Sequence, residues 1–149
     1  MNHTLFRAVR LHAFAALVTL AFQPAAHAAD ITAVVGNVTQ DTGSIILGLF
    51  DTAQSFPKTP IKGVKINASE RNAQGQVRLV LQDVAPGDYA ASAYQDLNGD
   101  GKLNTNLMGL PTEPYGFSKN ARGAFGPPDF KDAAFTVPAQ GVTIELQVK

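Results

Sequence analysis

The chain has 149 residues, with 12 basic and 12 acidic side chains, no cysteine, and histidine only at His3, His12 and His27. A chain without cysteine has no disulfide and no thiolate nucleophile, and the balanced charge lacks the basic footprint of a nucleic-acid-binding protein. Because the three histidines all precede residue 28, the rest of the chain has no imidazole for general-base catalysis or for metal ligation.

The first element along the chain is an N-terminal segment of the kind that directs export. Two arginines precede an almost wholly apolar run over residues 11–22, and Ala26 and Ala28 fit the small-x-small rule for cleavage. The apolar run is shorter than the roughly 20 residues that a membrane-spanning helix needs. We therefore expect a cleaved signal peptide over residues 1–28, no membrane span, and a periplasmic or secreted domain over residues 29–149.

Short β-type segments separated by turn residues fill most of that domain. Alternation of apolar and polar residues is clearest at residues 76–82 and 142–148, and no stretch after the signal has a helical period. This pattern predicts an all-β fold, a single antiparallel seven-stranded β-sandwich. The expected strands are residues 31–38, 43–51, 62–68, 76–82, 89–96, 134–137 and 142–148. The expected core includes Leu47, Leu79, Leu81, Ile144 and Leu146.

One long loop rich in glycine, proline and aromatic residues interrupts this series at residues 97–132. Loops of this length are uncommon unless they are functional. Its aromatic residues fit a binding surface whose rings stack on a sugar or a peptide. They also fit a local core that covers one end of the sandwich, which is the commoner arrangement in a small domain. The possible surface residues are Tyr115, Phe117, Phe125 and Phe130.

The start of this loop resembles the first half of a calcium-binding loop. Residues 96–101 fit the pattern D-x-[DN]-x-[DN]-G. In such a loop alternate residues turn their oxygens inward toward the ion, and the glycine allows the sharp turn that brings them together. The expected ligands of Ca²⁺ are the side chains of Asp96, Asn98, Asp100 and Asn104 and the main-chain carbonyl of Lys102.

The match to a calcium loop is incomplete at its end. Leu107 occupies the position where a bidentate acid closes such a loop. An acid from elsewhere has to supply the missing oxygens, and Glu113 or Asp129 is the candidate. The alternative is a polar turn in which the Asp and Asn side chains only cap main-chain amides.

Four motifs in the second half of the chain resemble one bacterial exported family, the domain of unknown function 2141. They are P-G-x-Y at residues 86–89, the D-x-N-x-[DN]-G-K-L loop, G-[IL]-P-x-E-x-Y-G-F-S at residues 109–118, and P-P-x-F-x-[DE]-A-x-F at residues 127–135. Asn104 departs from the family, where aspartate is common. The resemblance implies a small β-sandwich of the transthyretin or prealbumin-like kind, and it brings no known catalytic residue.

These observations favour an exported, non-enzymatic binding or accessory module of the cell envelope with a structural calcium site. Its partner would be an envelope protein or a carbohydrate. One alternative is a histidine-free hydrolase that acts on carbohydrate with a pair of carboxylates such as Glu113 and Asp129. The other alternative is a structural protein of the envelope.

Overall fold

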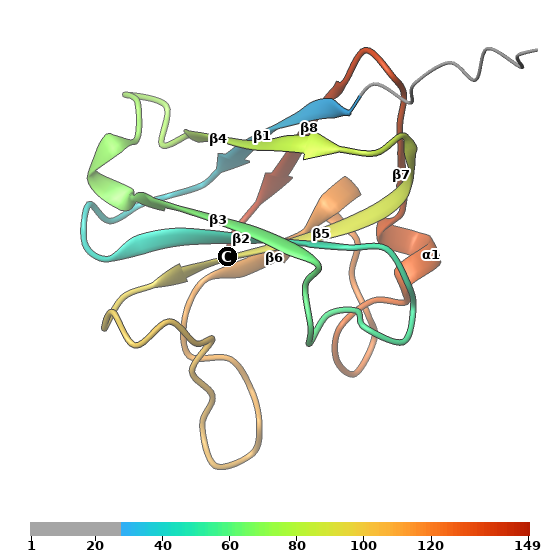
Figure 1. The fold of residues 1–149 in the computed structure, drawn as a ribbon. Helices are drawn as coiled ribbons and strands as arrows, with labels where there is room; N and C mark the ends of the chain where they lie inside the picture. The colour runs from blue at the N-terminus through green and yellow to red at the C-terminus, as the bar shows by residue number, and fades with distance from the viewer. Residues whose placement is uncertain (1–27) are drawn as a thin grey trace, which may run out of the picture.

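A computed structural model describes residues 28–149 (Figure 1). The predicted signal peptide, apart from its last residue, lies outside the described residues. The described chain is mostly β, with eight strands, one short helix and two short 3-10 turns. The strands are β1 (Ala29–Gly36), β2 (Ser44–Phe50), β3 (Lys62–Asn67), β4 (Val77–Val84), β5 (Gly87–Asp96), β6 (Tyr115–Phe117), β7 (Phe135–Val137) and β8 (Val142–Gln147); the helix is α1 (Phe130–Ala133), and the 3-10 turns are η1 (Ala68–Glu70) and η2 (Ser118–Asn120).

The strands form two sheets (Figure 1). In the first, the order is β4-β1-β8, and β1 pairs antiparallel with β4 but parallel with β8. In the second, the order is β3-β2-β5-β6, all antiparallel, and β7 pairs with the start of β5. None of the described residues form a helix long and apolar enough to cross a membrane.

Two features of the predicted sheet are wrong. There are eight strands instead of seven, because β6 forms within the segment predicted to be one long loop. Three residues are too few to show a period. β6 is held instead by β5 on one side and by main-chain hydrogen bonds between Tyr115 and Lys149 on the other. The sheets are also not wholly antiparallel, because alternation along a strand does not encode the direction of its neighbour.

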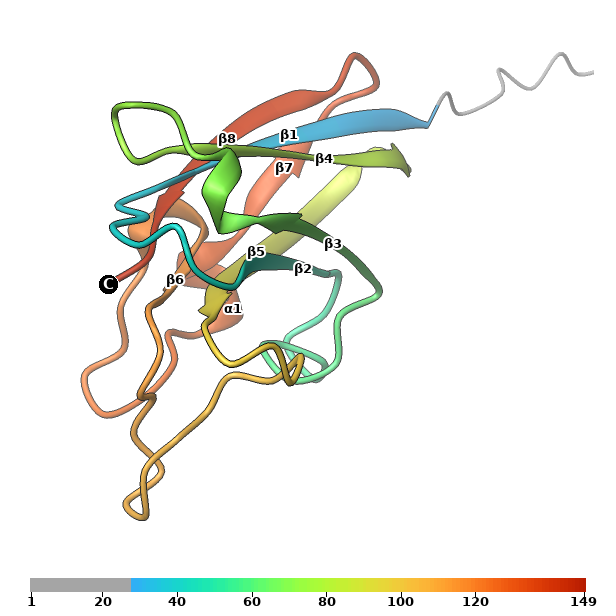
Figure 2. The ribbon, with the colours of Figure 1, turned by 90° about the vertical axis from the view of Figure 1, so that its left-hand side faces the viewer.

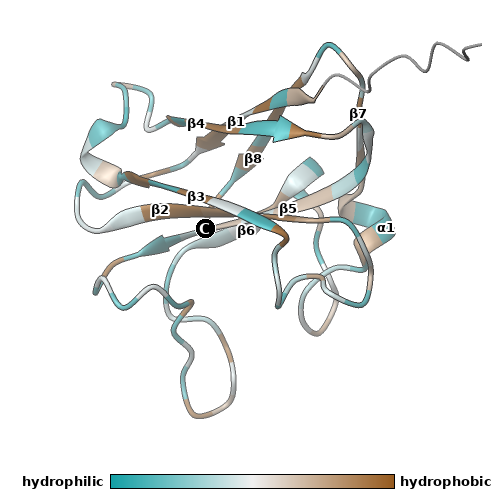
Figure 3. Ribbon diagram, viewed as in Figure 1, coloured by the Kyte–Doolittle hydropathy of each residue, from teal (hydrophilic) through white to brown (hydrophobic). Residues whose placement is uncertain are grey.

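One hydrophobic core draws its residues from both sheets. Alternate residues of every strand except β6 face it, such as Ile31, Ala33 and Val35 of β1. Figure 3 shows the apolar residues distributed along the strands. Fully burying a leucine-sized side chain stabilises the fold by about 1.5–3 kcal/mol. All five predicted core residues are at most 8% exposed, so the prediction is confirmed; they are Leu47, Leu79, Leu81, Ile144 and Leu146.

A smaller aromatic cluster lies on the opposite, outward face of the second sheet. Phe50 belongs to it, whereas its neighbour Leu49 belongs to the main core. The Phe56 ring packs edge-on against Phe50, Phe117 and Phe130, with centroid distances of 5.2, 5.5 and 6.0 Å. The cluster fixes the segments before β3 and after β6 to the sheet.

The chain between β5 and β6 projects away from both sheets (Figure 2). At its far end the outgoing and returning halves of the loop approach each other, with a bridge between Thr105 and Pro111 and a hydrogen bond from Asn106 N–H to the Leu110 carbonyl. Its base contains the predicted calcium loop. This β5–β6 loop therefore places the candidate site at one end of the second sheet.

Candidate functional site

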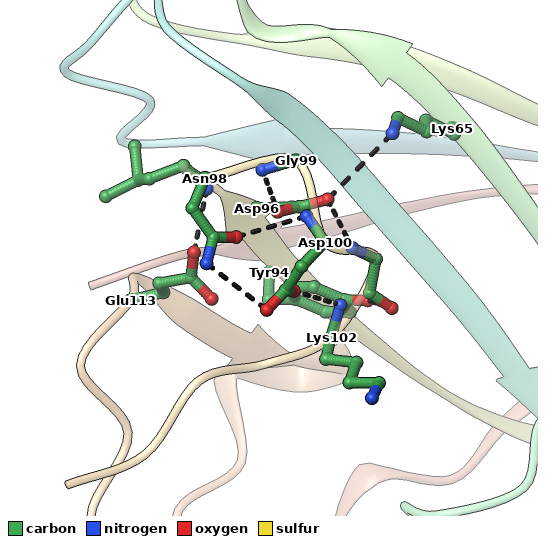
Figure 4. Close-up of polar contacts among 10 residues, drawn as sticks. Lys65, Tyr94, Asp96, Asn98, Gly99, Asp100, Lys102 and Glu113 are labelled. Atoms are coloured by element: carbon green, nitrogen blue, oxygen red, sulfur yellow. Dashed lines mark hydrogen bonds and ion pairs between the residues drawn. The ribbon is translucent and has the colours of Figure 1, made fainter.

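Asp96 is the last residue of β5, and its side chain is wholly buried. Oδ1 accepts a hydrogen bond from Gly99 N–H at 2.7 Å, and Oδ2 accepts one from Gly101 N–H at 3.0 Å (Figure 4). Both glycines have a φ near +80°, in the left-handed region that favours glycine. The Lys65 ammonium lies 3.9 Å from Oδ2. The buried carboxylate therefore holds the first turn of the β5–β6 loop against the sheet.

Glu113 is a second buried carboxylate, at the other end of the same loop. Oε1 accepts a hydrogen bond from Leu97 N–H at 2.8 Å, and Oε2 accepts one from Asn104 N–H at 2.9 Å. Of the two acids that the sequence offered to close the calcium loop, the structure brings Glu113 to it. Asp129 lines a separate hollow and lies 3.5 Å from the Lys131 ammonium.

Asp100 lies on the exposed side of the loop. Oδ1 accepts a hydrogen bond from Lys102 N–H at 2.9 Å. Oδ2 accepts hydrogen bonds from the side-chain amides of Asn104 at 2.9 Å and Asn98 at 3.2 Å. These hydrogen bonds, first that from Asn104 and then that from the Lys102 N–H, lower the pKa of Asp100. The predicted calcium ligands thus also act as caps for main-chain and side-chain amides, as the polar-turn alternative requires.

One oxygen of the loop has no hydrogen-bond partner. The Asn104 side-chain nitrogen donates a hydrogen bond to Asp100. The Asn104 side-chain oxygen, Oδ1, is buried and accepts no hydrogen bond. The amide cannot rotate to exchange the two atoms without turning the oxygen toward a carboxylate. A buried acceptor without a partner is costly. A cation within the loop would satisfy this oxygen.

The atoms of the loop that could coordinate a cation are all oxygens. A carboxylate has about four acceptor positions, and the hydrogen bonds described above occupy two on Asp96 and two on Glu113. Within residues 28–149, no group of three or more His, Cys, Asp or Glu side chains is placed to hold a metal ion. A cation here would therefore depend on amide and main-chain oxygens as well, a set that suits hard Ca²⁺ and not a soft transition metal.

Tyr94 connects the sheet to this loop. Its hydroxyl donates a hydrogen bond to the Gly101 carbonyl at 2.8 Å. Burial raises the pKa of the Tyr94 hydroxyl, and the negative charges of Asp96, Glu113 and Asp100 raise it further. The phenol therefore keeps its proton, and with it the hydrogen bond, over a wider pH range than a free tyrosine does.

The raised pKa predicts how Tyr94 contributes to stability at alkaline pH. The contribution is fully present below the ordinary pKa of 10.0, and it is lost as the pH rises through the higher pKa of the folded state. An absorbance titration of phenolate in Tyr94→Phe should lack the component that titrates above 10.0 in the parent protein. If both proteins give the same alkaline component, another tyrosine is responsible.

A groove with a cavity volume of about 1130 Å³ lies beside the loop, on the outward face of the second sheet. Its floor includes Ile46, Gly48 and Ser92, whose neighbours Leu47 and Ala93 face the main core. The walls come from the β5–β6 loop, the segment between β2 and β3, and the segment after η2. Sequence reasoning missed this groove. Its signal was glycine and serine at outward strand positions, where longer polar side chains usually cover the sheet.

The four predicted surface aromatics lie around this groove in different environments. Tyr115, Phe117 and Phe125 line it, and Phe130 does not. Phe117 is buried within the aromatic cluster, and Tyr115 and Phe130 pack against that cluster. Phe125 is fully exposed. Three of the rings therefore build a local core, and one stands free at the rim of the groove.

Comparison with known proteins places the chain in one family. No curated protein and no solved structure matches it. Residues 33–145 match the family of uncharacterised proteins conserved in bacteria that is designated DUF2141. The matched segment begins in β1 and ends in β8, so it includes the groove and the β5–β6 loop. The chain therefore belongs to the DUF2141 family, as the four sequence motifs predicted.

Proposed function

We propose that the mature chain is a small transthyretin-like β-sandwich that serves as a non-enzymatic binding or accessory module of the bacterial cell envelope. The groove on the second sheet carries this proposal. Ligand sites are concave and mostly apolar, with a few polar groups. The groove has this character, because Ile46 and Gly48 lie in its floor and only a few polar side chains, among them Ser92 and Tyr94, belong to its lining.

The lining of the groove argues against the carbohydrate hydrolase. Glycoside hydrolysis requires two carboxyl groups on either side of the scissile bond, and no acidic side chain is among the described residues that line the groove. Both oxygens of Glu113 accept main-chain hydrogen bonds. Asp129 lines the separate hollow. A binding role therefore fits the residues better than catalysis does.

Sedimentation with isolated bacterial envelopes tests the binding role. The parent protein should bind saturably, and Ser92→Phe, which fills the floor of the groove, should lose this binding. Thr32→Phe is the matched control, because Thr32 is a partly exposed residue of β1 in the other sheet. Equal binding by Ser92→Phe and the parent protein would overturn the proposal. Release of soluble saccharide fragments by the parent protein would favour the hydrolase instead.

We also infer that the loop at Asp96–Asn106 binds a structural calcium ion. The support is the buried Asn104 Oδ1 without a donor, together with the arrival of Glu113 where the loop lacks its closing acid. The ion would share the free acceptor positions of Asp96 and Glu113 with the unpaired amide oxygen. Because few charged ligands are available, we expect weak affinity, in the range of about 10⁻⁴–10⁻³ M that extracellular modules use.

Export is tested by the N-terminus of the exported protein. The three zones of residues 1–28 predict that the mature chain begins at Ala29 or Asp30. Ala29 is the first residue of β1 and is buried against the core, so cleavage before it leaves the strand complete. N-terminal sequencing of protein from the envelope fraction should give this start. An intact Met1 would show that no signal peptide is removed.

A further inference from the structure

We propose that the groove binds an amphipathic carboxylate, a medium-chain or long-chain fatty acid, with its acyl chain on the floor of the groove. The inference deepens the proposed binding role and rests on it. It follows from three properties of the lining: the charges it carries, the polar groups it lacks, and the apolar side chains at its rim.

The charged groups of the lining are two lysines. Lys58 comes from the segment between β2 and β3, and Lys102 comes from the β5–β6 loop. Neither ammonium group forms an ion pair within residues 28–149, and no acid lines the groove among those residues. The pKa of Asp100 is lowered mainly by hydrogen bonds, first that from Asn104, and to a smaller degree by the nearby Lys102 ammonium, so Asp100 offsets the charge of Lys102 in part. Two cations in a lining whose described residues include no acid still attract an anion. The occupant therefore carries a negative charge.

The remaining polar groups are too few for a carbohydrate. Sugars present many hydroxyls, which need paired donors and acceptors such as planar amides and carboxylates. No Asn, Asp, Gln, Glu, Arg or His is among the described residues of the lining. The lining offers the hydroxyls of Ser92 and Thr105 instead, since the Tyr94 hydroxyl already donates to the Gly101 carbonyl. The body of the occupant is therefore apolar.

An extended peptide is also a poor fit. Peptides add to sheets at a free edge, where main-chain groups are unpaired. The groove lies on a sheet face, and the outer edge of β6 is already bonded, with Tyr115 N–H donating to the Lys149 carbonyl and Lys149 N–H donating to the Tyr115 carbonyl. The main chain of a peptide would find no free partner at β6, and β3, the other edge strand of this sheet, contributes only Gly63 to the lining.

The rim supplies the apolar contact that an acyl chain needs. Met108 and Leu110 of the β5–β6 loop and Phe125 of the facing segment line the groove, and all three are more than half exposed. Large apolar side chains exposed together on one side mark a surface that becomes covered. A flexible acyl chain can lie between them and over Ile46 and Ser92, whereas Pro60 and the Phe50 ring already cover Gly48.

Calorimetric titration of the exported protein with octanoate and decanoate, in calcium-free buffer, tests the inference. Each methylene buried strengthens binding about fourfold, so decanoate, which has two more methylenes, should bind roughly 15-fold more tightly than octanoate. 1-Decanol should bind about tenfold more weakly than decanoate, because it lacks the charge. Ser92→Phe should bind neither. Met108→Ser with Leu110→Ser alters only exposed side chains, and it should also weaken decanoate binding. This double variant therefore tests the groove even if Ser92→Phe is poorly folded.

Charge variants identify the role of the two lysines. Lys58→Gln with Lys102→Gln should weaken decanoate binding about tenfold, as expected when two exposed ion pairs are lost. Arg78→Gln with Lys131→Gln removes the same charge outside the groove and should leave binding unchanged. Equal losses in the two pairs, or equal binding of decanol and decanoate, would overturn the inference. Binding of maltohexaose but not of decanoate would overturn it and leave the binding role standing, whereas hydrolysis of maltohexaose would overturn both.

Discussion

Replacement of Asp96 by alanine should lower the free energy of unfolding by about 3 kcal/mol, because it removes two hydrogen bonds to a charged acceptor. The carboxylate is wholly buried, and it is the acceptor for Gly99 N–H and Gly101 N–H. Both amides lose their partner in Asp96→Ala, and the Lys65 ammonium loses its counter-charge. The loop should then detach at its first turn.

Chemical denaturation of Asp96→Ala beside Asp100→Ala measures this effect. The two variants remove the same charge from the same loop, but Asp100 is exposed and its hydrogen-bonded groups can turn to water. Asp100→Ala should therefore lose clearly less stability than Asp96→Ala. Equal losses would contradict the role of Asp96 as the buried anchor of the loop.

Gly43→Ala should destabilise the fold by about 3 kcal/mol. Gly43 precedes β2 and has a φ of +75°, a conformation that costs an alanine about 1–2 kcal/mol. A Cβ atom at this position would lie 2.0 Å from the main-chain carbonyl oxygen of Asp96. Because both partners of this contact are main chain, the start of β2 or the end of β5 has to move.

Gly109→Ala separates these two causes. Gly109 has a similar φ of +76°, and a Cβ atom there would have no neighbour within 4 Å. This variant carries the conformational cost alone and should lose about 1–2 kcal/mol. Thermal unfolding of both variants gives the comparison. If Gly43→Ala is no less stable than Gly109→Ala, the contact with Asp96 has no energetic importance.

The sequence predicted the features of the fold that depend on local pattern. Alternation placed Leu79 and Leu81 in the core because β4 has one buried face and one exposed face. β6 escaped prediction because it depends on partners far along the chain, β5 and Lys149. The direction of β8 beside β1 escaped for a related reason, since either direction buries the same residues.

The candidate site could likewise be predicted only where it depends on local sequence. The spacing of Asp96, Asn98 and Asp100 marked the loop, because these residues occupy alternate positions of one short motif. Whether Glu113 or Asp129 approaches the loop depends on the path of the chain between them, which no local pattern describes. The groove was hidden because it arises where loops from three parts of the sequence surround one face of the second sheet.

Thermal unfolding with calcium or with a chelator tests the calcium loop most directly. At a tenfold excess over its Kd, calcium should add about 1.4 kcal/mol to stability, which raises the midpoint by roughly 5 °C for a domain of this size. Equal concentrations of magnesium serve as the ionic control. Asp100→Ala with Asn104→Ala, which removes two predicted ligands without touching buried Asp96, should abolish the calcium shift. A parent midpoint that calcium leaves unchanged, or an equal shift in this double variant, would contradict a calcium ion in the Asp96–Asn106 loop.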